Sequence, residues 1–169
     1  MVNTSNQRIT WKGKPLKVTG REVHVGEAAP RLRLVGKDLE DITSDQFVGK
    51  QLILSVVPSL DTSTCAEQTR RFNQAAQKFA SNVVILTISE DLPFAQARWC
   101  GAEGVANVIM ASNYKYRNFG EDFGVSIPEL GLLTRAVFVT GVDGTIKHVE
   151  YVEDLSAEPD YQAALNALA

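Results

Sequence analysis

The sequence is poor in the residues that build disulfide frameworks and metal sites. It has 169 residues but only two cysteines and two histidines, and it contains no C-x-x-C pair. A structural zinc site needs about four nitrogen or sulfur ligands, usually in close pairs. The cysteines of this chain cannot supply them, which excludes a structural zinc site of that kind.

Long apolar runs and clusters of one charge are also missing. No apolar run approaches the roughly 20 residues that span a bilayer, and the polar N-terminal segment has no apolar stretch typical of a secretory signal. Basic residues are scattered through a chain of formal charge -3, so no basic run indicates a nucleic-acid-binding surface. We expect a cytoplasmic protein that binds neither membranes nor nucleic acid.

The composition is that of an ordinary globular protein. Hydrophobic residues make up 44% and charged residues 22%, enough to bury a substantial core. The length predicts one domain over residues 1–169. Because structural disulfides are rare in the cytosol, where disulfides are more often transient and catalytic, the two cysteines are of special interest.

Apolar runs and helical patterns alternate along the chain. A parallel half-sheet covered by helices follows from this order, with an antiparallel hairpin at its edge and a second, N-terminal hairpin over residues 1–25. The arrangement is α/β and resembles the thioredoxin-like fold, a central mixed sheet flanked by helices. Strands are predicted at 51–57, 82–89, 107–112 and on both sides of a turn at 141–144, with a short extended piece at 21–26; helices are predicted at 65–80, 91–100, partly over 113–124, and after Pro159.

Cys65 follows a polar turn at the front of a predicted helix. Thr64 and Glu67 match the capping box T-x-x-E, which makes Thr64 the expected N-cap and Cys65 the first helical residue. Unpaired N–H groups and the helix dipole at that position favour a thiolate. The alternative is a small buried hydrophobic residue, since free cysteine is among the most buried residue types.

Some residues around Cys65 favour a reactive thiolate and others disfavour it. The Thr62 hydroxyl, three residues earlier, can donate to sulfur or accept from an incoming O–H, and the ring of Pro58 can shield the sulfur from water. Asp61 and Glu67 disfavour a thiolate unless they point away or are paired. A cation from elsewhere is therefore required, and spacing alone leaves four candidates: Arg70, Arg71, Arg98 and Arg135.

Cys100 lies at the other end of a predicted helix, which Gly101 is expected to stop. There the helix dipole disfavours a thiolate, so Cys100 does not fit the role of first attacker. A disulfide with Cys65 requires the two Cα atoms to come within about 7 Å.

The stretch "PSLDTSTC" resembles the peroxiredoxin signature P-x-x-x-[T/S]-x-x-C, with Pro58, Thr62 and Cys65 in register. Longer segments are similar to the thiol peroxidase branch of that superfamily, and the only departure noted is Thr134, where a small residue such as alanine is expected. The segments are "DTSTCAEQTRRFN", "ISEDLPFAQARWCGAEG", "SNYKYRNFGEDFGV", "GLLTRAVFV" and "EPDYQAAL".

This resemblance implies an atypical two-cysteine peroxiredoxin. Cys65 would be the peroxidatic cysteine and Cys100 the resolving one, joined in an intrachain disulfide, while Thr62, Arg135 and Pro58 would complete the site. The substrates would be hydrogen peroxide and alkyl hydroperoxides, the reductant thioredoxin and the assembly a homodimer. No metal or organic cofactor would be needed, because sulfur carries the electrons.

Three other functions stay open at the level of sequence. A thiol–disulfide oxidoreductase acting on proteins is disfavoured by the lack of C-x-x-C. A non-catalytic binding protein on the same fold would tolerate loss of Cys65. A peroxide sensor would require a mixed disulfide with a partner protein.

Overall fold

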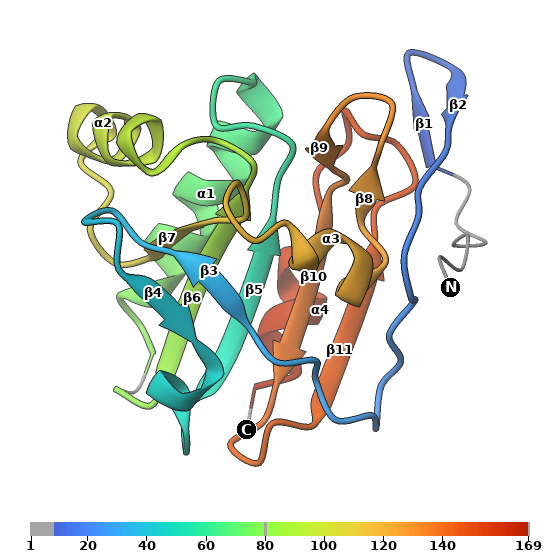
Figure 1. The fold of residues 1–169 in the computed structure, drawn as a ribbon. Coiled ribbons are helices and arrows are strands. Elements are labelled where there is room, and N and C mark those ends of the chain that lie inside the picture. Colours follow the sequence, from blue (N-terminus) through green and yellow to red (C-terminus); the bar gives the residue numbers. More distant parts are fainter. Residues whose placement is uncertain (1–8, 80, 169) are drawn as a thin grey trace.

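A seven-stranded mixed sheet organises the chain, which the computed structural model describes over residues 9–79 and 81–168 (Figure 1). The strands are β3 (Arg33–Val35), β4 (Asp41–Thr43), β5 (Gln51–Val56), β6 (Val83–Ser89), β7 (Ile109–Ser112), β10 (Ala136–Thr140) and β11 (Ile146–Tyr151). They lie in the order β11-β10-β5-β6-β7-β3-β4, with β5, β6 and β7 parallel and β10 and β3 joining them antiparallel. The predicted α/β fold with a central mixed sheet is confirmed. A single domain over residues 1–169 stays a prediction.

Helices cover both faces of this sheet. Helices α1 (Ser63–Ala76) and α4 (Tyr161–Asn166) pack on one face, while α3 (Asn118–Phe123) packs on the other. Because side chains alternate along a strand, neighbouring residues of β5 feed the two cores. The α1 and α4 face contains Ile53, Phe72, Ile85, Val137, Val139 and Ala164, and the α3 face contains Leu52, Leu54, Leu86, Ile88, Phe119, Phe123 and Phe138.

The helix boundaries differ from the predicted ones at both cysteines. Helix α1 begins at Ser63 and has Thr62 as its N-cap, so the prediction that Thr64 caps it was wrong, as was the predicted end at residue 80. Helix α2 (Pro93–Glu103) starts two residues after the predicted residue 91 and runs past Cys100. The predicted stop at Gly101 was wrong because Gly104, at φ 66°, forms the left-handed C-cap.

The N-terminal hairpin forms within the predicted region. Strands β1 (Ile9–Trp11) and β2 (Lys14–Leu16) pair antiparallel across Lys12 and Gly13, both at positive φ. Two left-handed residues define the tight hairpin turn whose twist matches that of the strands. The hairpin thus turns at Lys12 and Gly13, and residues 1–8 of the predicted extension lie outside the described part.

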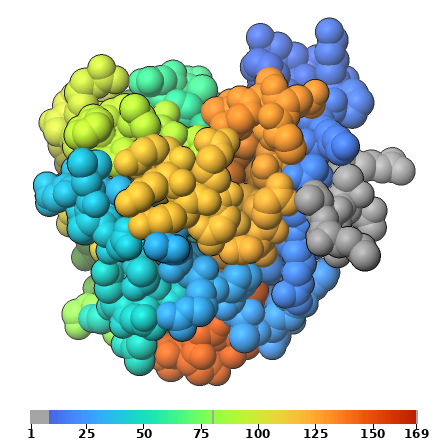
Figure 2. All heavy atoms as spheres, viewed as in Figure 1, coloured from blue at the N-terminus to red at the C-terminus, as the bar shows by residue number. Residues whose placement is uncertain are grey.

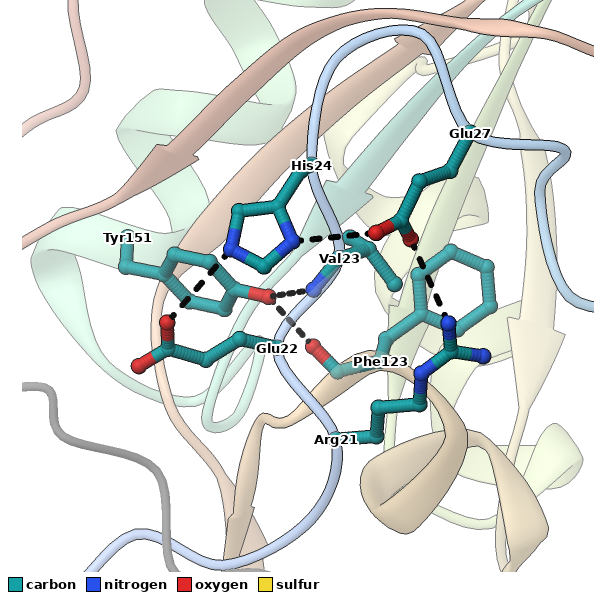
Figure 3. Close-up of polar contacts among 7 residues, drawn as sticks. All are labelled: Arg21, Glu22, Val23, His24, Glu27, Phe123 and Tyr151. Carbon is teal, nitrogen blue, oxygen red and sulfur yellow. Dashed lines mark hydrogen bonds and ion pairs between the residues drawn. The ribbon is translucent and has the colours of Figure 1, made fainter.

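The segment after this hairpin runs along the molecule and pairs with other segments only at isolated bridges in the described residues. Residues 21–26 were predicted as a short extended piece, and they form no strand ladder. Instead, the Tyr151 hydroxyl accepts a hydrogen bond from Val23 N at 3.0 Å and donates one to Phe123 O at 2.7 Å (Figure 3). Burial raises the pKa of Tyr151 to about 12, so this phenol stays protonated and keeps donating at neutral pH.

Two small elements were not foreseen from the sequence. Strands β8 (Ser126–Ile127) and β9 (Leu132–Leu133) form a short hairpin before β10, and the 3-10 helix η1 (Ser44–Phe47) leads from β4 to β5. The hairpin matters for the site because it directs the chain into Thr134 and Arg135. In residues 9–79 and 81–168, no helix has the length and apolar character needed to cross a membrane.

Candidate active site

Cys65 lies at the edge of the sheet where the parallel strands end. Strand β5 finishes at Val56, a turn follows over residues 57–62, and Cys65 is the third residue of α1. Ligand sites of open α/β sheets form beyond the carboxyl ends of their strands. The Cys65 side chain has no exposed surface, while the turn itself lies at the surface between α2 and the β8–β9 hairpin (Figure 2).

Arg135 reaches Cys65 from the segment between β9 and β10. Its Nη2 donates to Cys65 Sγ across 3.3 Å, and its side chain is 1% exposed. A buried guanidinium that donates to sulfur favours the thiolate, as does the N-terminus of a helix. Of the four candidate cations from the sequence, the structure brings Arg135 to the sulfur.

Two other groups hold the guanidinium in that orientation. Leu155 O accepts from Arg135 Nε at 3.2 Å and from Nη2 at 2.9 Å, and Gln68 Oε1 accepts from Nη1 at 2.9 Å. Gln68 is itself fixed because its Nε2 donates to Ser55 Oγ in β5. The Arg135 side chain is thus bound to α1 and to the segment after β11, and is linked to the sheet through Gln68.

The remaining arginines have other partners or are exposed. Arg70 pairs with Glu103 at 3.0 Å and with Glu67 at 3.6 Å. Arg71 lies over the ring of Tyr161 at 4.5 Å, and Arg98 is exposed. Glu67 is therefore paired with a cation, one of the two ways in which that acid becomes compatible with a thiolate at Cys65.

Thr62 and Pro58 both precede Cys65 in the chain, in the turn that leads to α1. The Thr62 hydroxyl donates to Ser59 O at 3.1 Å, which leaves its lone pairs to accept from an incoming O–H. Pro58 is buried directly after Val57. Of the predicted site residues, Cys65 and Arg135 are in contact, and Thr62 and Pro58 lie in the turn that leads to them.

Sequence reasoning missed two polar residues of this region. Gln68 orients Arg135, and its position one helical turn after Cys65 on a buried helix face was the available signal. Asp91 was predicted to open α2, but Leu92 is the N-cap and the Asp91 carboxylate turns to Ser59 and Leu60 in the Cys65 turn. A carboxylate next to a helix start is most simply read as a cap, so nothing local indicated this contact.

Cys100 lies in the last turn of α2 and is half-buried. Its carbonyl accepts the hydrogen bonds of Gly104 N and Val105 N that close the helix. Burial raises the pKa of the Cys100 thiol, and the charge of Lys37 opposes this in part. Both cysteines are free thiols, and Cys100 packs against the apolar cluster formed by Val57, Leu60, Cys65 and Met110.

No group of three or more histidine, cysteine or carboxylate side chains is arranged to bind a metal in the described ranges. The chemistry that the site offers is that of a sulfur nucleophile beside a fixed cation. Two free cysteines at one cluster on this fold are typical of one class of protein, the thiol-dependent redox proteins on a thioredoxin-like fold.

Comparison with known proteins agrees with this class, since residues 24–165 match the family model described as Redoxin, and the chain belongs to that family. Among its curated relatives, the thiol peroxidase of Streptococcus pneumoniae strain R6 is 48% identical over 159 residues, covering 94% of this chain and 97% of the relative. That of Listeria innocua is 46% identical over 160 residues, covering 95% and 96%. Within the redoxins the chain is one of the thiol peroxidases, which are peroxiredoxin-type oxidoreductases.

Solved structures have the same fold. A peroxiredoxin-like protein from Aquifex aeolicus superposes with a TM-score of 0.86 at 34% identity, covering 97% of this chain and 96% of that one. A thiol peroxidase from Chromobacterium violaceum gives a TM-score of 0.84 at 19% identity, covering 96% and 95%. The second likeness concerns the fold alone.

Proposed function

We propose that this protein reduces hydrogen peroxide and alkyl hydroperoxides to water and alcohols, as part of antioxidant defence. The observation that carries the proposal is the 3.3 Å contact between Arg135 Nη2 and Cys65 Sγ at the buried start of α1. A fixed guanidinium beside a cysteine is the environment of a nucleophilic sulfur, whereas a structural cysteine needs no cation. The identity to curated thiol peroxidases supports the same reaction.

In the first step the Cys65 thiolate attacks one oxygen of the peroxide in line with the O–O bond. The S–O bond forms as the O–O bond breaks, and Cys65 becomes a sulfenic acid. The leaving oxygen takes two electrons and a proton, and departs as water or alcohol. Arg135 stabilises the negative charge that moves onto this oxygen, while the Thr62 hydroxyl and the Cys65 N–H hold the peroxide, with Pro58 covering the site.

In the second step the Cys100 sulfur attacks the sulfenic acid, and an intrachain Cys65–Cys100 disulfide forms with release of water. The free thiols lie in two different helices, so the start of α1 and the segment around Cys100 rearrange before the bond closes. That both cysteines border the cluster around Met110 supports their pairing within one subunit.

The disulfide is then reduced by an external dithiol through exchange, and thioredoxin is the proposed donor. The protein acts in the cytoplasm as a homodimer in this proposal. Sulfur carries both electrons, so the reaction needs no metal and no organic cofactor.

Mass spectrometry of the intact protein after one equivalent of peroxide tests the proposal. The wild type is expected to lose two hydrogens and to yield a cross-linked Cys65–Cys100 peptide. Cys100→Ser should stop at a Cys65 sulfenic acid, and Cys65→Ser should stay unmodified as the matched control. A stable sulfenic or sulfinic acid in the wild type, with Cys100 untouched, would contradict the two-cysteine scheme.

Consumption of peroxide with thioredoxin and its reductase tests the cycle as a whole. Steady turnover with thioredoxin and no reduction of insulin disulfides are expected. Insulin reduction without peroxide turnover would identify a thiol–disulfide oxidoreductase instead.

A further inference from the structure

A hydrogen-bond network joins the turn before α1 to helix α2, and the scheme above does not use it. The Asp91 carboxylate accepts from Ser59 Oγ at 2.8 Å and from Leu60 N at 2.9 Å. Ser59 O in turn accepts from both N and Oγ1 of Thr62, at 3.2 and 3.1 Å. Asp91 therefore fixes the backbone on which the Thr62 hydroxyl stands.

The same carboxylate is connected to the helix of the second cysteine. Ser89 Oγ donates to Asp91 Oδ2 at 2.8 Å and accepts from Gln96 Nε2 at 3.1 Å. Gln96 belongs to α2, one helical turn before Cys100, and its Nε2 also donates to Ala111 O in β7. Ser89 and Gln96 have no exposed surface, so no water competes for these bonds.

From this arrangement we propose that Asp91 is a positioning residue that holds the Thr62 turn in place for the peroxide reaction, and that Gln96 holds α2 closed through the same network. This inference rests on the proposed function. The network serves the first chemical step, because the turn must be ordered to orient the peroxide. It opposes the second step, because the turn and α2 must separate from the sheet edge before Cys100 reaches Cys65.

The network has two arms, the contacts of Asp91 with the Thr62 turn and the contact of Gln96 that holds α2, and the geometry assigns them different effects. Three donors converge on the Asp91 carboxylate, from Ser59, Leu60 and Ser89, and hydrogen bonds to a charged acceptor are the strong ones. Replacing Asp91 thus releases the turn and also weakens the attachment of α2, which is linked to Asp91 through Ser89. Replacing Gln96 releases α2 alone, because Ser89 can still donate to Asp91. Gln96→Met suits this purpose, since it keeps the shape and removes an Oε1 that is buried without a partner among the described residues.

The experiment separates the two steps in Asp91→Asn and Gln96→Met. The second-order rate constant of Cys65 oxidation by hydrogen peroxide is measured in a Cys100→Ser background, by quenched intact mass spectrometry. The first-order rate constant of disulfide formation is measured with both cysteines present, by acid quench and alkylation of the remaining thiols.

Asp91→Asn is expected to slow Cys65 oxidation by about tenfold or more, because small misplacements of orienting groups are costly in rate. It should accelerate disulfide formation by about tenfold, the effect of losing one hydrogen bond to a charged group. Gln96→Met should leave Cys65 oxidation within about threefold and accelerate disulfide formation by about three- to tenfold, the effect of a neutral hydrogen bond.

Two controls separate positioning from charge and from stability. Asp38→Asn removes an exposed carboxylate from the loop between β3 and β4, and both rate constants should stay within about twofold, as for an ordinary surface change. Val139→Ala destabilises the core on the α1 and α4 face and should leave the ratio of the two rate constants unchanged. A ratio that changes in Asp91→Asn but not in Val139→Ala therefore reports positioning and not a general loosening of the protein.

An unchanged oxidation rate in Asp91→Asn would overturn the positioning role, and a fall of both rate constants together would overturn the opposition between the steps. If Gln96→Met does not accelerate disulfide formation, the α2 arm is wrong. If the wild type forms no Cys65–Cys100 disulfide, the proposed function fails at that step and the α2 arm fails with it. The oxidation rate of Asp91→Asn still decides whether Asp91 positions the turn.

Discussion

The two cysteines of this chain sit at opposite ends of neighbouring helices, in different surroundings. Cys65 is the third residue of α1, fully buried, and accepts a hydrogen bond from Arg135. Cys100 lies in the last turn of α2, at the end of the helix dipole that disfavours a thiolate, and burial raises the pKa of its thiol. In the proposed function, one helix end and one arginine give these two identical side chains different reactivity.

Removing the cation at Cys65 is expected to have the largest effect. Arg135→Met should lower the rate constant of Cys65 oxidation by about 10²- to 10³-fold, as for loss of one donor that stabilises transition-state charge. It also leaves Leu155 O and Gln68 Oε1 unpaired, at a cost of about 1–3 kcal/mol each in unfolding free energy. Stopped-flow oxidation and denaturant unfolding measure the two effects.

Arg98→Met is the matched control for Arg135→Met, because Arg98 is an exposed arginine on α2. It should change neither the activation free energy of Cys65 oxidation nor the unfolding free energy by more than ~0.5 kcal/mol. An Arg135→Met variant that stays folded and oxidises at the wild-type rate would show that the guanidinium is structural.

Changing the pH tests the Cys100 side of the comparison. The thiolate is the attacking form, and burial raises the pKa of the Cys100 thiol, so this group is mostly a protonated thiol at neutral pH. Disulfide formation should therefore accelerate with rising pH, by up to about tenfold per unit below that pKa. Quenched alkylation between pH 6 and pH 9 measures it. A flat profile would mean that opening of the helices, and not the thiolate fraction, limits the step.

Gln68 offers a smaller change on the Cys65 side. Gln68→Met removes the acceptor of Arg135 Nη1 and the donor to Ser55 while keeping the shape of the side chain. Cys65 oxidation should slow by about tenfold, as for loss of a hydrogen bond to a charged group. Gln74→Met, an exposed position on the same helix, should match the wild type. Equal rates in the two variants would leave Leu155 O as the group that orients Arg135.

The smallest effect is expected at the surface contact between the two helices. Glu103→Gln weakens the pair with Arg70, whose partners are 39% and 35% exposed. Exposed pairs of this kind contribute about 0.2–1 kcal/mol, so the unfolding free energy should change by no more than that. A larger loss in chemical denaturation would identify this pair as a principal link between α1 and α2.

The main strands of the central sheet and the place of Cys65 near the start of a helix were predictable because their signals are local. The apolar run at 51–57, the capping residues before Cys65 and the Asp143-Gly144 turn each depend on neighbours in sequence. The choice of Arg135 among the four arginines was not predictable from spacing, because only the fold brings it next to residue 65. The resemblance to peroxiredoxins supplied that choice instead. Thr64 was taken for the N-cap because Thr62, Ser63 and Thr64 are all suitable capping residues. The contacts of Gln68 and Asp91 depend on long-range packing that no local pattern records.

The N-terminal hairpin has a consequence for anyone who shortens or tags this chain. Thr10 in β1 donates through its N to Glu153 O at 2.8 Å and accepts through its O from Leu155 N at 2.9 Å. Leu155 O is the carbonyl that holds the Arg135 guanidinium. A cloning boundary placed after Leu16 would remove a strand that supports Arg135 through Leu155, although the two are far apart in sequence. An inactive truncated preparation would therefore say little about the thiol itself.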